Sequence, residues 1–318
     1  MSQVVEAALA ELRQGRWILA VSGGRDSMVL LDAAWKAKLR DVVAVATFDH
    51  GTGAPATLAA EHVEREASRF EFTVVRGAGT LAGKPSEESL RKSRWDFLNK
   101  QALKLRARVV TAHTLDDHAE TTFIRILRDS GARGLAGMLV PSAIARPLLL
   151  VKRADVVAYA KANDVKWVED PSNASMAFLR NRVRHEILPA MERARPGFTQ
   201  WLLVTSARGA TWRRGLSDAV DHMQAGVAPG ILSAAWIVGA SPAKGGVPGM
   251  TPEAAAVVWP EVASRVGLTL DWRGIERLVK EAPKLKPGAD IPLSGGASLQ
   301  RTITTFVFRN PRGGGPLY

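Results

Sequence analysis

Near its N-terminus the chain reads Trp17-Ile18-Leu19-Ala20-Val21-Ser22-Gly23-Gly24-Arg25-Asp26-Ser27-Met28-Val29-Leu30-Leu31, two apolar runs joined by a glycine-rich turn. The first run is typical of a buried strand, and the second has apolar residues at helical spacing. A turn of this kind presents unpaired amides at a helix start, and glycine lets the backbone approach a phosphate closely. The turn therefore predicts a phosphate site made by Ser22, Gly23, Gly24, Arg25, Asp26 and Ser27.

The polar side chains of the turn suit a nucleoside triphosphate. The hydroxyls of Ser22 and Ser27 can donate to phosphate oxygens, and Asp26 can hold a magnesium ion shared with them. The turn lacks the Gly-x-x-x-x-Gly-Lys-Ser/Thr pattern of a Walker loop. We therefore expect ATP and Mg²⁺ here, with Asp26 as the metal ligand. A tight strand-to-helix turn with a serine cap is the simpler alternative.

The composition limits the class of protein. A net charge of +12 over 318 residues favours a polyanionic partner, first of all nucleic acid. No apolar run approaches the length that spans a bilayer, so we expect a cytoplasmic protein without a membrane partner. Cysteine is absent, which excludes disulfides, a thiolate nucleophile, an iron–sulfur cluster with cysteine ligands and a thiolate zinc site.

The first half of the chain alternates strands and helices. Further buried strands are predicted at Val42–Phe48, Phe72–Val75 and Arg108–Ala112, with helices at about 55–70, 86–104 and 114–129 between and after them. Continuous apolar strands alternating with helices predict an α/β fold with a doubly wound, mostly parallel, five-stranded sheet. Ligands of such sheets bind at the carboxyl ends of the strands, so we also assign His50 and His113 to the ATP site.

Two domains are expected from the length and from a change of pattern near residues 189–196. The prediction is an ATP-binding domain at 1–190 and a C-terminal region at 191–318; the family resemblance given below implies that the first is catalytic and that the second binds tRNA. Within that region we expect a helical part at about 191–238, a Gly/Pro/Ala-rich linker at about 239–250, and a small α+β part at about 251–318 that ends in a hairpin.

Acidic residues gather where a helix is predicted to follow the strand Arg108–Ala112. Asp117 and Glu120 are three residues apart and share a helix face, which makes a pocket for a metal or an ammonium group. Capping of the helix N-terminus is the alternative explanation. The spacing of His113 and His118 does not fit a zinc site on one helix face.

Two helical segments carry arginines. Arg91 and Arg94 lie on one face of the segment 88–98, either as a solvated face or directed at phosphate or an acid. Arg180 and Arg184 lie one helical turn apart, and Arg182 points elsewhere. Like charges this close repel unless an anion lies between them, so we expect RNA phosphate contacts from Arg180, Arg182 and Arg184, or an arginine that reaches the nucleotide site.

Taken in order, these segments resemble the tRNA(Ile)-lysidine synthase family, a branch of the PP-loop ATP pyrophosphatases. The matching stretches are Ser22–Ser27, Asp49–Gly51, Glu88–Leu98, Thr111–Thr121, Arg128–Met138, Arg146–Leu149, Glu169–Asn173 and Arg180–Arg182. They cover about the first 190 residues. The chain departs from the family pattern at Trp95, Thr114, His118 and Asp129, and at Thr52-Gly53, where the family tends to carry Leu-Arg.

The resemblance implies a ligase that adenylates the wobble cytidine in the CAU anticodon of an isoleucine tRNA and then joins free L-lysine to it. It implies that Asp117 and Glu120 bind lysine together with Arg182, and that Asp26, Arg91 and Arg94 complete the catalytic set. Oligomeric state is left open, with a homodimer among the options.

Two other classes compete with this interpretation. Another PP-loop enzyme is one, although thiolation is disfavoured by the absence of cysteine, and amide-forming ligases do not need so basic a chain. A non-catalytic RNA-binding protein that keeps a nucleotide fold is the other. The paired carboxylates argue against it.

Overall fold

The computed structural model describes residues 2–79, 87–140, 142–170, 175–239 and 249–311. Its contacts divide the chain into two compact units, Met1–Arg208 and Gly209–Tyr318. The division falls inside helix α10 (Phe198–Met223), whereas the sequence pattern suggested residue 190. The reason is that Leu188, at the start of helix α9 (Leu188–Ala194), packs with Phe123 and Leu202 in one apolar cluster of the first unit.

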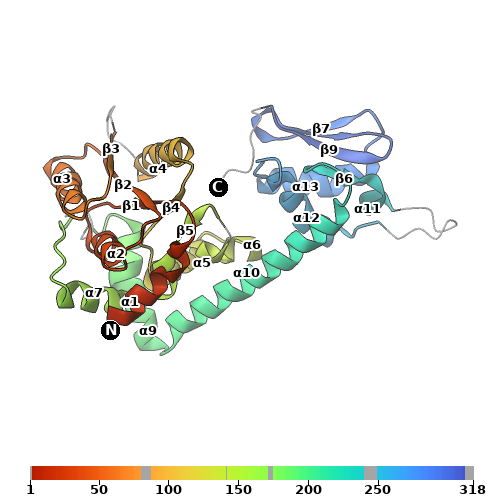
Figure 1. The fold of residues 1–318 in the computed structure, drawn as a ribbon. Helices are drawn as coiled ribbons and strands as arrows, with labels where there is room; N and C mark the ends of the chain where they lie inside the picture. The colour runs from red at the N-terminus through yellow and green to blue at the C-terminus, as the bar shows by residue number, and fades with distance from the viewer. Residues whose placement is uncertain (1, 80–86, 141, 171–174, 240–248, 312–318) are drawn as a thin grey trace. The chain divides into compact units, whose positions relative to one another are not determined.

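The first unit alternates strands and helices (Figure 1). Its strands are β1 (Trp17–Ala20), β2 (Val42–Asp49), β3 (Val74–Ala78), β4 (Arg108–Val110) and β5 (Ile144–Ala145). Its helices are α1 (Ser2–Ala8), α2 (Arg25–Lys36), α3 (Ala54–Arg69), α4 (Glu87–Leu105), α5 (Leu115–Leu127), α6 (Ala132–Leu135), α7 (Arg153–Ala162), α8 (Leu179–Arg182), α9 and the first part of α10. A π-helical segment, Val183–Ile187, joins α8 to α9.

The strands form one sheet in the order β3-β2-β1-β4-β5, and every neighbouring pair is parallel. The predicted fold class is thereby confirmed. The fifth strand, β5, pairs only Ile144 with Val109 and Ala145 with Val110. Two residues give no periodic signal, so the sequence did not locate this strand.

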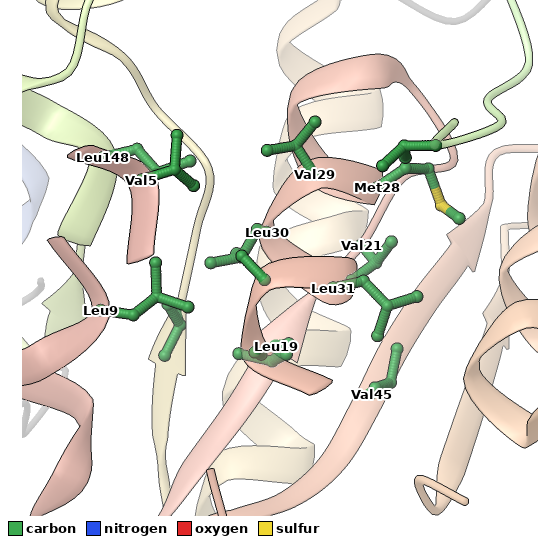
Figure 2. Close-up of a cluster of buried hydrophobic side chains, with 14 of the residues drawn as sticks. Val5, Leu9, Leu19, Val21, Met28, Val29, Leu30, Leu31, Val45 and Leu148 are labelled. Carbon is green, nitrogen blue, oxygen red and sulfur yellow. The ribbon is translucent and has the colours of Figure 1, made fainter. Parts of the chain in front are cut away.

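Both faces of the sheet are buried, as continuous apolar strands require. Leu19 belongs to a core that contains residues of α1, α2, α3 and α7, whereas its neighbour Ile18 belongs to a second core completed by α4. Figure 2 shows the first core, in which Leu19, Val21 and Val45 lie near Leu30 and Leu31 of α2, and Val5 of α1 lies beside Leu148. Successive strand residues point to opposite faces, so this alternation fixes helices on both sides.

The strand order reverses direction between β1 and β4. In open α/β sheets the chain leaves two such neighbouring strands toward opposite faces, which opens a crevice at their carboxyl ends. The glycine-rich turn follows β1, and the acidic segment opening α5 follows β4. The topology thus brings the two predicted chemical segments to the same edge of the sheet.

The second unit is built on an antiparallel sheet in the order β6-β9-β8-β7. The strands are β6 (Ile231–Ser233), β7 (Asp290–Pro292), β8 (Ser298–Arg301) and β9 (Thr305–Arg309), and β8 and β9 form the predicted hairpin. The rest of α10, with α11 (Ala234–Val238), α12 (Pro252–Ser264) and α13 (Trp272–Glu281), completes the unit. Its core centres on Trp259, whose ring meets those of Phe306 and Phe308 edge-on at 5.7 Å.

Some predicted features lie outside the described residues. These are most of the linker at 239–250, part of the Glu169–Asn173 stretch, and the end of the α+β part beyond residue 311. Across the part of the chain that is described, no helix combines the length and apolarity needed to cross a membrane.

Candidate active site

A cavity of about 390 Å³ lies where β1, β2 and β4 end. Eight of the predicted site residues line it: Ser22, Gly24, Asp26, Ser27, His50, Arg94, His113 and Asp117. The segment after β1 and the segment after β4 therefore face the same space. The volume is within the usual range for a small-molecule site.

The glycine-rich turn is held in shape by its own backbone and hydroxyls. Gly23 has φ of +84°, a conformation that favours glycine. A Cβ at Gly23 would lie 2.8 Å from the carbonyl oxygen of Ala59 in α3. The Ser27 hydroxyl donates to the Gly24 carbonyl at 2.8 Å and accepts from the Ser22 amide at 3.1 Å. The turn thus leads directly into the first turn of α2, where helix geometry leaves amides free for an anion.

Asp26 stands at this helix start and faces the cavity. Its Oδ1 accepts from Arg25 Nε at 2.9 Å, so Arg25 is occupied with Asp26 and is not among the cavity-lining residues. Burial raises the pKa of Asp26, the Arg25 charge lowers it, and the Asp117 charge raises it further, with a net rise. A cation between the two carboxylates would relieve this unfavourable charge.

The segment after β2 forms a second side of the cavity. Asp49 fixes it, since its carboxylate accepts from the Gly51 amide, the Thr57 hydroxyl and Arg76 Nη2 at 2.8, 2.9 and 3.1 Å. His50 lines the cavity and packs edge-on against Phe48 at 5.0 Å. Burial, with the nearby Arg94 charge, lowers the pKa of His50, so the ring is neutral at pH 7.

Helix α4 supplies an apolar wall and one cation. Trp95 and Leu98 line the cavity, as does Phe48 from β2. Burial and the positive charges of Arg91 and Arg180 lower the pKa of Arg94, which marks a site short of negative charge. Arg91 is exposed, with its guanidinium 5.9 Å from the Trp95 ring centre, and is not among the lining residues.

His113, the first histidine after β4, also lines the cavity. Its Nδ1 lies 2.8 Å from the Thr111 hydroxyl. Burial lowers the pKa of His113 to about 4, so the ring is neutral at physiological pH. A neutral imidazole can donate to or accept from a ligand, but it is not a cation for phosphate.

Asp117 both caps the N-terminus of α5 and faces the cavity, so both explanations of the acidic segment, helix capping and a cation pocket, apply to it. It forms a capping box with Thr114, accepting from the Thr114 amide at 2.9 Å and hydroxyl at 2.8 Å. Its other oxygen meets arginines, and the residue lines the cavity. Burial alone would raise the pKa of Asp117, but the Arg153 charge and the Thr114 hydrogen bonds lower it overall. Asp117 therefore stays ionised.

Glu120 lies behind Asp117, with a side chain only 2% exposed. It is not among the cavity-lining residues, because arginines surround it. The neighbours are Arg153, Arg180 and Arg184, with nitrogen–oxygen distances of 2.9, 3.2 and 2.7 Å. Glu120 and Asp117 are thus brought together as predicted, but Glu120 is reached only through this arginine cluster.

Sequence reasoning missed Arg153. It is the first residue of α7, its amide donates to Asp116 at 2.7 Å, and its Nη2 donates to both Asp117 and Glu120. More than thirty residues separate it from these carboxylates, so no periodicity links them. One signal was present: a basic residue in the first turn of a helix opposes the helix dipole, which needs an explanation.

The three predicted RNA-contacting arginines, Arg180, Arg182 and Arg184, fall into two groups. Arg180 and Arg184 reach back to Asp117 and Glu120, in line with the alternative that an arginine reaches the site. Arg182 is exposed and not among the cavity-lining residues. Its predicted contact with lysine has no support in this geometry, and contact of these three arginines with tRNA remains a prediction.

The chain is similar to known proteins in sequence and in structure. A family model described as a PP-loop domain matches residues 1–191. The tRNA(Ile)-lysidine synthase of Thermobifida fusca (strain YX) is 36% identical over 251 residues, which cover 74% of this chain and 76% of that protein. This chain belongs to the tRNA(Ile)-lysidine synthase family. Another relative, the tRNA(Ile)-lysidine synthase of Coxiella burnetii, is 33% identical over 194 residues.

Coverage differs among the members of this family. The match to the Coxiella protein spans 56% of this chain but only 42% of that protein, and the same 42% holds for the Pseudomonas fluorescens relative. Among solved structures, the U34-tRNA thiolase NcsA from Methanococcus maripaludis with its [4Fe-4S] cluster aligns with a TM-score of 0.54 at 15% identity. The alignment covers 65% of this chain and 77% of the thiolase chain, which shows a shared fold.

The structure also places the departures from the family pattern. Trp95 and Thr52 line the cavity, so they change its surface directly. Thr114 caps α5 and fixes Asp117. His118 is 1% exposed, and neither of its ring nitrogens has a partner among the described atoms.

Proposed function

We propose that this protein joins L-lysine to the wobble cytidine of an isoleucine tRNA with a CAU anticodon, at the expense of ATP. One observation carries the proposal: the glycine-rich turn and Asp117 line a single cavity. An anion site and a cation site on the walls of one cavity suit a reaction between a nucleotide and an amine. Family membership supports the same substrates.

ATP binds with its phosphates at the start of α2. The first amides of that helix, with the Ser22 hydroxyl, donate to phosphate oxygens, while the Ser27 hydroxyl donates to the Gly24 carbonyl oxygen and keeps the turn in shape. The adenine base packs against the apolar side of the cavity, which includes Phe48 and Ala59. His50, neutral and next to Phe48, is placed to hydrogen-bond the nucleotide.

The residues present fit a magnesium ion bound with the triphosphate. Among the described residues, no group of three acidic or imidazole side chains lies close enough together to hold a metal ion. Magnesium commonly takes one or two carboxylates plus substrate phosphates, and Asp26 is a carboxylate whose raised pKa signals a need for positive charge. When bound, the ion would be held by Asp26 and would supply positive charge to the pyrophosphate leaving group.

The reaction takes two steps. The cytidine O2 attacks the α-phosphorus of ATP, so an O–P bond forms while the bond to pyrophosphate breaks. The ammonium group of lysine then gives a proton to the carboxylate that binds it, the resulting amine attacks cytidine C2, and AMP leaves with the former O2 atom. Arg94, a poorly compensated cation in the cavity, stabilises negative charge that develops on the phosphoryl group.

Asp117 holds the lysine amine near the nucleotide. Because its pKa is lowered, it stays charged and binds an ammonium group well. Glu120 adds a second negative charge directly behind it. The net positive charge of the chain, +12, supports attraction of tRNA phosphates.

The test is incubation of the protein with ATP, radiolabelled lysine and a transcript of the isoleucine tRNA with the CAU anticodon. We expect label in the tRNA, dependent on ATP, and none with a transcript whose anticodon is GAU. Label transfer to the GAU transcript, or transfer of other amino acids in place of lysine, would contradict the proposal. Cleavage of ATP without label in RNA would indicate a different PP-loop reaction.

A further inference from the structure

The two acidic side chains of the proposed lysine site have no acceptor left to offer. An ionised carboxylate has about four acceptor positions. Glu120 accepts four hydrogen bonds, from Arg153 Nη2, Arg180 Nε, and Arg184 Nε and Nη2, at 2.9, 3.2, 2.7 and 2.9 Å. Asp117 also accepts four, two from Thr114 and one each from Arg153 and Arg184 at 3.1 and 2.9 Å.

An incoming ammonium group therefore has to displace a donor that is already bound. It brings three N–H donors and needs three acceptors. Departure of Arg180 frees one carboxylate position, and departure of Arg153 frees two. Departure of Arg184 frees three, one on Asp117 and two on Glu120.

The three arginines also differ in how firmly they are held. Arg180 donates in addition to the Thr121 hydroxyl and the Asp117 carbonyl oxygen. Arg153 is fixed through its own amide, which donates to Asp116. The three hydrogen bonds of Arg184 all go to the two carboxylates, and its side chain is 26% exposed. It lies in the π-helical segment Val183–Ile187, a backbone form found mostly as short insertions in α-helices and frequent at functional sites.

We propose that the Arg184 guanidinium is a place-holder for the amine of the substrate, and that lysine binds by displacing it. This inference rests on the proposed function, because it assigns a lysine site to Asp117 and Glu120. The exchange replaces one cation by another, so the buried carboxylates are never left without a counter-charge. The displaced Arg184 becomes free to contact an anion, and the polyanion that the reaction brings is tRNA.

Reciprocal coupling follows. If tRNA phosphate stabilises Arg184 in its displaced position, tRNA strengthens lysine binding, and lysine strengthens tRNA binding by the same factor. Such coupling would keep the amine site closed by Arg184 until RNA is present.

Calorimetric titration of lysine into the full chain tests this idea. Arg184→Met removes the competing donors and keeps an apolar stem, so lysine should bind at least about tenfold more tightly than to the wild type without tRNA. Arg193→Met, an exposed arginine in the last turn of α9, is the matched control and should leave lysine affinity unchanged. Adding tRNA should strengthen lysine binding to the wild type but not to Arg184→Met.

Lysine binding by Arg184→Met that is no tighter than that of the wild type, with unchanged thermal unfolding, would overturn the proposal. If that variant does not fold, Arg184→Gln is judged by the same criterion. If neither folds, the wild type decides, since absence of tRNA–lysine coupling also overturns it. A wild type that incorporates no lysine into tRNA contradicts the ligase function itself, whereas incorporation without these effects removes only the place-holder role.

Discussion

Replacing Gly23 by alanine should damage the nucleotide site while leaving its chemistry-bearing side chains intact. The residue has φ of +84°, and an alanine in the left-handed region costs about 1–2 kcal/mol. Its Cβ would lie 2.8 Å from the Ala59 carbonyl oxygen and 2.9 Å from the Ala59 Cβ. These atoms belong to a helix and its short side chain, so they cannot swing away, and overpacking adds about 1 kcal/mol or more.

We therefore expect Gly23→Ala to lose about 2–3 kcal/mol of stability, which for a unit of this size lowers the unfolding midpoint by about 4–12 °C. Gly24→Ala is the matched control, because its φ is −76° and its Cβ would find only the Ser22 hydroxyl, at 3.7 Å. Differential scanning calorimetry without nucleotide compares the two. Equal midpoints for both variants would refute the argument that the turn requires glycine at position 23. ATP affinity of Gly23→Ala should also fall by about tenfold or more, since the displaced turn no longer aims its amides.

Three further predictions address other parts of the first unit. Asp117→Asn should abolish lysine-dependent product while adenylated tRNA still forms, which rapid-quench analysis with labelled ATP can show; loss of both would remove Asp117 from the amine site. Burial lowers the pKa of His118 to about 4, below its unfolded value near 6.5, so the stability it contributes at neutral pH is lost as pH falls from about 6.5 toward 4. Between pH 7.5 and 5 the wild type should lose about 2 kcal/mol more than His118→Gln in urea unfolding, and equal losses would contradict the assignment. If the exposed Arg182 contacts RNA phosphate, Arg182→Ala should reduce the slope of log affinity against log salt by about one, and an unchanged slope would place the RNA contact elsewhere.

Much of the first unit was predictable because its signals are local. The strands β1, β2 and β4 are apolar runs, and the turn at Ser22–Ser27 carries its own chemistry. The convergence of this turn with Asp117 followed from the rule that parallel strands place their carboxyl ends together. The family resemblance rested on the same segments and was confirmed.

The arginine cluster could not be predicted in this way. Arg153 reaches Asp117 and Glu120 only because α7 begins beside α5, and that placement depends on the packing of the whole unit. Arg180 and Arg184 had two equally good explanations in the sequence, since a guanidinium suits phosphate and carboxylate alike. Only the three-dimensional arrangement shows which group each one contacts.

The glycine-rich turn has one support that comes from far along the chain. The amide of Val168 donates to the Gly23 carbonyl oxygen at 3.0 Å, although more than a hundred residues separate the two. During synthesis on the ribosome, β1 and α2 therefore emerge long before the turn between them can be completed. A nascent chain that stops short of residue 168 would hold the phosphate-binding amino acids without the brace that shapes them, and competence for nucleotide would arise late in translation.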